Sequence, residues 1–188
     1  MDEKFIIASD IHGSAYWCEK LLEVYHREQP KKLVLLGDIL YHGPRNPFPD
    51  GYKPQDVADK LNAIKDHLIC VRGNCDSEVD QMVLSFPILA DYALLSANGK
   101  TFFLTHGHLF SDGNPPCLSS GETLFNGHFH LPTFKRLDGG INYANCGSVA
   151  LPKDGSPHSC VIFQGCELSW LDLSSNKVFH KVDLNRTF

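Results

Sequence analysis

The chain has 188 residues, of which 43% are hydrophobic and 21% are charged, and its formal net charge is −5. This composition is typical of one globular domain spanning residues 1–188 and excludes a disordered chain. It also argues against stable nucleic-acid binding, because that binding needs many cations on one face and the sequence has no lysine and arginine cluster.

The first half of the chain alternates short apolar runs with helical patterns. Apolar residues recur at helical spacing over residues 15–27 and again over residues 56–66. Strands that alternate with helices in this way pair in parallel and are buried on both faces. The predicted strands are the continuous apolar runs at residues 5–8, 33–36 and 68–71.

The rest of the chain has a different pattern. Residues 42–55 contain four prolines and two glycines, which indicates a long and often functional loop. Residues 92–96 and 100–105 flank Asn98-Gly99, a strong hairpin signal. Later β-rich runs occupy residues 161–163, 168–173 and 178–182. The mixture predicts an α/β fold, a four-layer αββα sandwich of two mixed β-sheets flanked by helices.

Polar residues gather where the apolar runs end, which is the edge at which such sheets bind ligands. Taken singly, an aspartate after a strand is usually a turn or cap residue. As a set, carboxylate, amide and imidazole groups without thiolate suit Mn²⁺, Fe or Zn²⁺, and seven candidates fit two ions that share a carboxylate. The predicted ligands are Asp10, His12, Asp38, Asn74, His106, His128 and His130.

A family resemblance extends over these positions. The chain resembles the calcineurin-like metallophosphoesterases in five motifs that occur in the same order: Asp10-x-His12, Gly37-Asp38, Gly73-Asn74-Cys75-Asp76, His106-Gly107-His108 and Gly127-His128-x-His130. Within that superfamily it is most similar to compact bacterial phosphodiesterases, through residues 9–13, 42–46, 71–82 and 104–110. The cofactor expected from the ligand types and the resemblance is a pair of divalent ions, first of all Mn²⁺, with Zn²⁺, Fe or Ni²⁺ as alternatives.

The resemblance also assigns roles. It implies that Asp10, His12 and His130 bind one ion, that Asn74, His106 and His128 bind the other, and that Asp38 bridges them. A hydroxide between two cations is expected to attack phosphorus in line, without a covalent phosphoenzyme. The expected enzyme is a phosphodiesterase acting on a small phosphodiester, with Asn74, Cys75 and His106 as catalytic residues.

Cys75 departs from the superfamily pattern, in which many members carry a histidine that donates a proton to the leaving oxygen. A thiol of ordinary pKa is neutral at pH 7 and a weak donor. We therefore hypothesise that Cys75 favours diesters with stabilised leaving groups over monoesters. The alternative is that Cys75 only fills space beside the metals.

Five further residues are candidates for a substrate contact or for support of the ligands. Asp76 either orients a ligand or caps the helix that follows. The resemblance implies that His108 lies beside the first metal, with or without binding it. Asn145 begins the turn Asn145-Cys146-Gly147-Ser148, which resembles the superfamily's Asn-Pro-Gly-Ser turn near the metals. His42 and Arg45, on the long loop, either reach a substrate phosphate or lie in solvent.

Two other functions are also compatible with the sequence. A phosphomonoesterase or nucleotide pyrophosphatase on the same site is the enzymatic alternative, and a metal-binding interaction scaffold of the retromer-subunit kind is the other. Apolar residues on the late strands, Trp170, Leu171 and Phe179, suit either a core or a homo-oligomer interface, in a dimer or tetramer. Seven irregularly spaced cysteines, no secretory signal and no bilayer-length apolar run predict a cytoplasmic protein without membrane contact.

Overall fold

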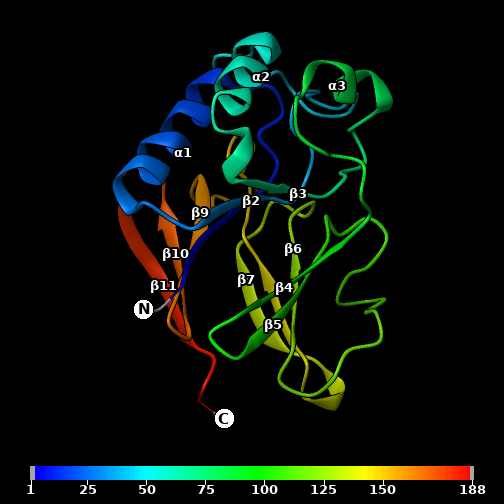
Figure 1. Ribbon diagram of the computed structural model, residues 1–188, viewed down its shortest axis with the longest axis vertical. Helices are drawn as coiled ribbons and strands as arrows, with labels where there is room; N and C mark the ends of the chain where they lie inside the picture. Colours follow the sequence, from blue (N-terminus) through cyan, green and yellow to red (C-terminus); the bar gives the residue numbers. More distant parts are fainter. Residues whose placement is uncertain (1–2, 187–188) are drawn as a thin grey trace.

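Two mixed β-sheets pack face to face in the computed structural model, which describes residues 3–186 (Figure 1). The first sheet has six strands in the order β11-β10-β9-β1-β2-β3. Strand β1 pairs in parallel with β2 and antiparallel with β9, so this sheet is parallel at one edge and antiparallel at the other. Its strands are β1 (Lys4–Ala8), β2 (Lys32–Leu35), β3 (Leu68–Cys70), β9 (Ser159–Gln164), β10 (Glu167–Asp172) and β11 (Lys177–Asp183).

The second sheet has five strands in the order β4-β5-β6-β8-β7. Strand β6 pairs in parallel with both of its neighbours, β5 and β8, while the edge strands β4 and β7 pair antiparallel. The strands are β4 (Ala93–Ala97), β5 (Lys100–Leu104), β6 (Thr123–Asn126), β7 (Thr133–Arg136) and β8 (Asn142–Asn145).

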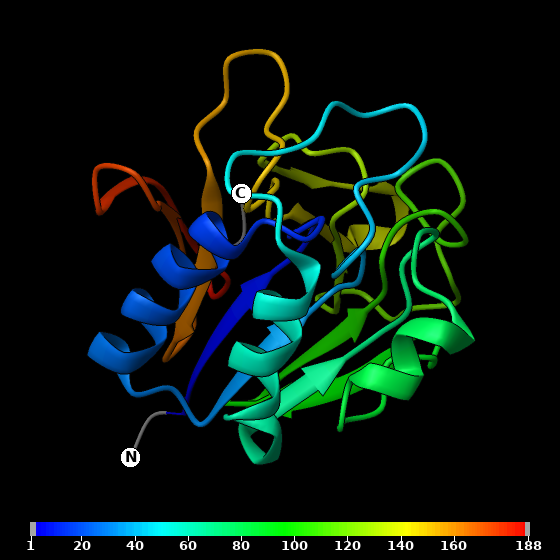
Figure 2. The ribbon, with the colours of Figure 1, turned by 90° about the horizontal axis from the view of Figure 1, so that it is seen from above.

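Helices α1 (Ala15–Glu28) and α2 (Pro54–Asn62) lie together on the outer face of the six-stranded sheet (Figure 2). Leu21 and Val57 from these helices are fully buried against Leu35 of β2. Fully burying an aliphatic side chain stabilises a fold by roughly 1.5–3 kcal/mol. Short helices complete the chain: α3 (Glu78–Val83), η1 (Lys65–His67) and η2 (Asp138–Gly140).

Aromatic side chains fill the space between the two sheets. Phe5 and Phe163 of the six-stranded sheet meet Phe102 and Phe125 of the five-stranded sheet, and all four are almost fully buried. Trp170 of β10 joins them, and its Nε1–H donates to the Asn145 backbone carbonyl at 2.8 Å. Because that bond ties the end of β8 to the other sheet, the core and the site edge are connected directly.

The predicted α/β sandwich of two mixed sheets is confirmed, with one difference in its outer layer. Within residues 3–186 no helix of more than three residues covers the outer face of the five-stranded sheet; Phe110 and Leu118, from the segment between β5 and β6, pack there against Phe103 and Leu124. This crossover contains Gly113-Asn114-Pro115-Pro116, which cannot continue a helix. A coil therefore replaces the expected helix.

Several predicted elements shift or were missed. The helix predicted over residues 56–66 begins at Pro54, whose fixed φ suits the first helical turn, and ends at Asn62. Strands β6, β7 and β8 were not predicted. Of the residues proposed for a core or an interface, Trp170 and Leu171 are core, whereas Phe179 is 44% exposed. Among the described residues, no helix combines the length and the apolarity that a membrane crossing needs.

Candidate metal centre

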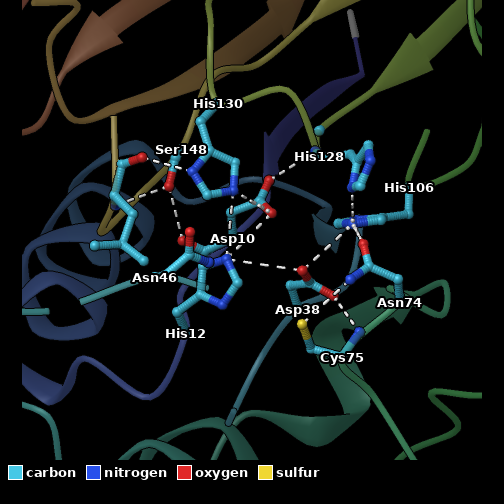
Figure 3. Close-up of polar contacts among 12 residues, drawn as sticks. Asp10, His12, Asp38, Asn46, Asn74, Cys75, His106, His128, His130 and Ser148 are labelled. Carbon is cyan, nitrogen blue, oxygen red and sulfur yellow. Dashed lines mark hydrogen bonds and ion pairs between the residues drawn. The ribbon is translucent and has the colours of Figure 1, made fainter. Parts of the chain in front are cut away.

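The seven predicted ligands all follow the carboxyl ends of strands, and the structure brings them together at one edge (Figure 3). Five of them adopt a left-handed backbone, which is uncommon for residues other than glycine and concentrates at functional sites. The chain turns sharply after each strand, so consecutive ligands of one motif point to the same place. The φ angles are 61° at Asp10, 49° at His12, 54° at Asp38, 61° at His128 and 60° at His130.

Asp10, His12 and His130 form the first group of ligands. His12 Nδ1 donates to the Tyr41 carbonyl at 2.8 Å, and His130 Nδ1 donates to the Leu151 carbonyl at 2.6 Å. Since a carbonyl can only accept, each ring must carry its proton on Nδ1, and its Nε2 faces the site. The two Nε2 atoms lie 3.4 Å apart, and Asp10 Oδ1 lies 3.5 Å from that of His12 and 3.1 Å from that of His130.

Asn74, His106 and His128 form the second group. His106 Nδ1 donates to the Leu36 carbonyl at 2.7 Å, which turns Nε2 toward the site. That Nε2 lies 3.1 Å from Asn74 Oδ1 and 3.2 Å from His128 Nδ1. Three atoms from three different loops therefore converge on one point.

Asp38 lies between the two groups (Figure 3). Its Oδ2 is 3.7 Å from His12 Nε2 and 3.5 Å from His106 Nε2, while its Oδ1 accepts the Cys75 backbone N–H at 2.8 Å. One carboxylate oxygen is thus shared between the groups and the other is held by the backbone. This is the position that a bridging ligand of two ions needs.

The donor atoms fit divalent cations. Asp10 Oδ1 is buried and has no hydrogen-bond partner among the described residues. The Nε2 atoms of His12 and His130 present lone pairs to each other whenever both rings are neutral, and lone pairs at this distance repel. A cation placed among these atoms removes both penalties, and the oxygen and imidazole donors suit a metal such as Mn²⁺, Fe or Zn²⁺.

The pKa values of the ligand side chains also favour binding of a cation. Burial opposes a charge on Asp10, yet the neighbouring His12 and His130 imidazoles hold the pKa of its carboxyl well below the usual range. Burial also disfavours the imidazolium of His106, but the Asp38 carboxylate and the charge of Asp10 raise the pKa of that ring to about 9. Burial and then the charge of His106 lower the pKa of His128 to about 4. Anionic carboxylates therefore attract positive charge to the site.

Asp76 holds the loops that carry the ligands. Its carboxylate accepts three backbone N–H groups, from Asp38 at 2.8 Å, Ile39 at 2.9 Å and Gly73 at 2.7 Å. Within residues 3–186 no imidazole hydrogen-bonds to it, and the cap of α3 is Ser77. The predicted cap role is therefore wrong, whereas Asp76 does orient a ligand: it accepts the backbone N–H of Asp38 and joins the loops after β2 and β3.

Two other polar residues hold the backbone around the ligands: Asn145 contacts the loop that carries His128 and His130, and Ser148 contacts the loop that carries Asp10. Asn145 Nδ2 donates to the Gly127 carbonyl at 2.6 Å, and its Oδ1 accepts the Gly147 N–H at 2.9 Å. Ser148 Oγ donates to the Asp10 carbonyl at 2.9 Å and accepts the Leu151 N–H at 2.9 Å. The turn that begins at Asn145 thus lies beside the candidate centre and fixes its backbone.

His108 lies next to the second group of ligands. Its ring centroid is 5.4 Å from that of His106 and 6.3 Å from that of His128. Among the described residues its Nδ1 is buried without a partner, and burial and then the charge of His106 lower its pKa. The His108 ring thus lies beside the second group of ligands.

A cavity of about 440 Å³ opens above the ligands. Cys75 lines it, and burial, with the charge of Asp38, raises the pKa of the thiol above its ordinary value. Arg45 lines it too, whereas His42 does not, because its ring stacks on Phe48 with centroids 4.4 Å apart. Three other lining residues, Asn46, Phe129 and Lys153, were not predicted; the first two lie within stretches that resemble the family, but only the fold shows that they reach the cavity.

Known proteins are similar to this chain in sequence and in fold. The pattern of the Calcineurin-like phosphoesterase superfamily domain matches residues 4–167. Phosphodiesterase YfcE of Escherichia coli K12 is 44% identical over 182 residues, which cover 97% of this chain and 98% of that protein. The solved structure of YfcE, described as a phosphoesterase from E. coli, superimposes with a TM-score of 0.93 and covers 97% of this chain and 100% of its own.

More distant structures share the fold alone. An archaeal phosphodiesterase is 19% identical with a TM-score of 0.59, covering 95% of this chain and 98% of its own. Vps29 of Entamoeba histolytica, complexed with Zn²⁺, is 16% identical with a TM-score of 0.58, covering 97% and 99% of the two chains. The match to the superfamily domain and the near full-length identity with YfcE show that this chain belongs to the calcineurin-like phosphoesterase superfamily.

Proposed function

We propose that this chain is a phosphodiesterase whose centre holds two divalent cations, with Mn²⁺ as the preferred metal. The observation that carries the proposal is the position of Asp38 Oδ2, 3.7 Å from the nearest imidazole nitrogen of one ligand group and 3.5 Å from that of the other. The similarity to phosphodiesterase YfcE over nearly the full length supports the substrate class.

The ligand residues form two sets, one for each ion. Asp10, His12 and His130 would hold one ion, and Asn74, His106 and His128 the other, with Asp38 between them. Two divalent cations supply Lewis acidity at such a site: they lower the pKa of water toward neutrality and offset negative charge on the phosphoryl oxygens. With such ions bound, attack on phosphorus would be direct and in line, and no covalent phosphoenzyme would be needed.

The chain's own residues position these groups. Backbone carbonyls of Leu36, Tyr41 and Leu151 accept the Nδ1 protons of three ligand histidines and so keep each Nε2 free to bind a cation. Cys75 offers a neutral thiol at the cavity wall, because its pKa is raised. A neutral thiol at this position, in place of a cationic histidine, suits a diester with one negative charge better than a doubly charged monoester.

The test uses metal-free protein reloaded with Mn²⁺. We expect hydrolysis of bis(p-nitrophenyl) phosphate to exceed that of p-nitrophenyl phosphate, and Asp38→Asn to lose on the order of 100-fold or more in kcat/KM. Asp66→Asn is the matched control, since Asp66 is exposed and precedes β3 at the opposite end of the sheet from the site. Metal analysis should find two ions in the wild type and fewer in Asp38→Asn.

Other outcomes identify the alternatives. Faster turnover of the monoester would make the chain a phosphomonoesterase, and faster turnover of a nucleoside diphosphate ester would make it a pyrophosphatase. Complete absence of hydrolysis from folded, Mn²⁺-loaded protein would refute the enzymatic function and leave the scaffold hypothesis.

A further inference from the structure

Two cationic side chains stand at the mouth of the cavity above the candidate metal centre. Arg45 and Lys153 both line this cavity and both are exposed, whereas the ligands Asp10 and His106 below are completely buried. They come from separate loops, which project from the same side of the molecule, the one with Arg45 drawn in cyan and the one with Lys153 in orange (Figure 2). The fold therefore brings two positive charges to one opening.

These two cations have no partner in the part of the chain that the structure describes. Nearly all other lysines and arginines there bond to a carboxylate or a backbone carbonyl. Within residues 3–186 the only side chains of these types without such a bond are Arg45, Lys65, Lys153 and Lys177. Two of the four thus face the candidate active site.

The charge of a plain diester does not account for both cations. A diester carries one negative charge on its phosphoryl group, and the ligands at the floor of the cavity are where that group is bound in the proposed reaction. Arg45 and Lys153 then have no counter-charge unless the substrate carries another anion. A phosphate monoester carries a charge of about −1.5 to −2 at pH 7, which matches two cations, whereas a carboxylate matches one.

We propose that Arg45 and Lys153 bind a second phosphate group of the substrate, so that the preferred substrate is a phosphodiester that also carries a phosphate monoester. The guanidinium of Arg45 can donate two parallel hydrogen bonds to phosphate, and the ammonium of Lys153 adds a point charge from the facing loop. The cavity volume of about 440 Å³ is within the usual range for a small-molecule site. Phe129, 41% exposed on the same cavity, offers an apolar surface to the organic part that joins the two groups.

The test compares three diesters with the same p-nitrophenyl leaving group. The second ester group is phenyl, carboxymethylphenyl or phosphonomethylphenyl, and the phosphonate replaces a phosphate monoester because it cannot be hydrolysed. With Mn²⁺-loaded protein we expect kcat/KM for the phosphonate to exceed that for the phenyl diester by about tenfold, mainly through a lower KM, and to exceed that for the carboxylate. Added salt should reduce this preference, since both cations are exposed.

Arg45→Gln and Lys153→Gln should each reduce the phosphonate preference severalfold. Lys65→Gln is the matched control: it removes the charge of an unpaired, exposed lysine that precedes β3, whereas the ligand Asn74 follows that strand. This control should keep the wild-type preference. Calorimetric binding of the matching analogues, in which a methylene replaces the oxygen that joins phosphorus to the nitrophenyl group, repeats the comparison without turnover.

Because the inference rests on the proposed function, the outcomes separate the two. Equal kcat/KM for all three diesters, or a preference that survives in both glutamine variants, would overturn the role of Arg45 and Lys153 while leaving the diesterase intact. Equal preference for carboxylate and phosphonate would overturn the assignment to phosphate. If no diester is hydrolysed, the proposed function fails, and the binding comparison alone then supports or overturns the second anion site.

Discussion

Gly73 is the position where a single methyl group should disturb the centre most. A Cβ added there would lie 2.1 Å from Asp38 Oδ1 and 2.3 Å from the Asp38 backbone nitrogen, about 1 Å or more inside ordinary van der Waals contact. Asp38 cannot move away without loss, because its N–H donates to Asp76 at 2.8 Å and its Oδ1 accepts from Cys75 at 2.8 Å. Gly73→Ala must therefore displace the Asp38 carboxylate.

The cost follows from that displacement. Overpacking a tight site costs typically 1–3 kcal/mol, which for a protein of this size lowers Tm by roughly 2–12 °C. A shift of about 1 Å in a group that positions the reaction costs on the order of 100-fold in rate. We therefore expect Gly73→Ala to lose about that factor in kcat/KM on bis(p-nitrophenyl) phosphate and to bind Mn²⁺ more weakly.

Gly113→Ala is the matched control for this experiment. The nearest atom to a Cβ there is Ser111 Oγ at 3.8 Å, an ordinary contact, and the backbone of Gly113 does not have a positive φ. Thermal unfolding of the metal-free proteins, Mn²⁺ titration and steady-state kinetics should separate the two variants. If Gly73→Ala matches Gly113→Ala in all three, the close approach of Gly73 to Asp38 has no functional role.

Three further predictions concern residues around the centre. Cys75→His should raise the rate ratio of monoester to diester, measured with one leaving group, by about tenfold or more, because a cationic donor favours a doubly charged phosphate; an unchanged ratio would refute the hypothesis. Ser148→Ala removes the hydroxyl that bonds Asp10 and Leu151, and should cost about 1–3 kcal/mol in the free energy of unfolding and weaken metal binding, whereas the same change at exposed Ser175 should not weaken it. The ring of His158 stacks on that of Trp17 with centroids 3.5 Å apart, and burial lowers the pKa of His158. The neutral imidazole therefore stabilises the fold above about pH 6.5, and this contribution is lost as the pH falls. The difference in unfolding free energy between wild type and His158→Gln should therefore shrink from pH 7.5 toward pH 5.5, and a constant difference would contradict this.

Much of the site could be predicted because its ligand residues directly follow the strands in the sequence. Asp10 and Asp38 each come two or three residues after a buried apolar strand, and strands that pair in parallel end at one edge. That rule needs no knowledge of loop conformation. The identity of the donor atoms follows from residue type, and so the ligand candidates could be named before their distances were known.

The rest depends on contacts between segments that are distant in sequence. β6 and β8 are only four residues long and each contains two buried polar residues, so no long apolar run marks them. Asp76 accepts N–H groups from loops up to 38 residues away, and neither capping nor metal chemistry indicates that role. Lys153 reaches the cavity because the loop between β8 and β9 projects beside the loop after β2, a tertiary arrangement that has no local signature.

The distribution of the ligands over the two sheets has a consequence for how the protein unfolds. Asp10, Asp38 and Asn74 follow strands of the six-stranded sheet, and the ligand histidines 106, 128 and 130 follow strands of the five-stranded sheet, so each ion would cross-link both halves of the sandwich. A ligand that binds only the folded state stabilises it by mass action. Metal supply would then govern the lifetime and protease resistance of the chain as well as its turnover, and a metal-starved cell would hold less of the protein.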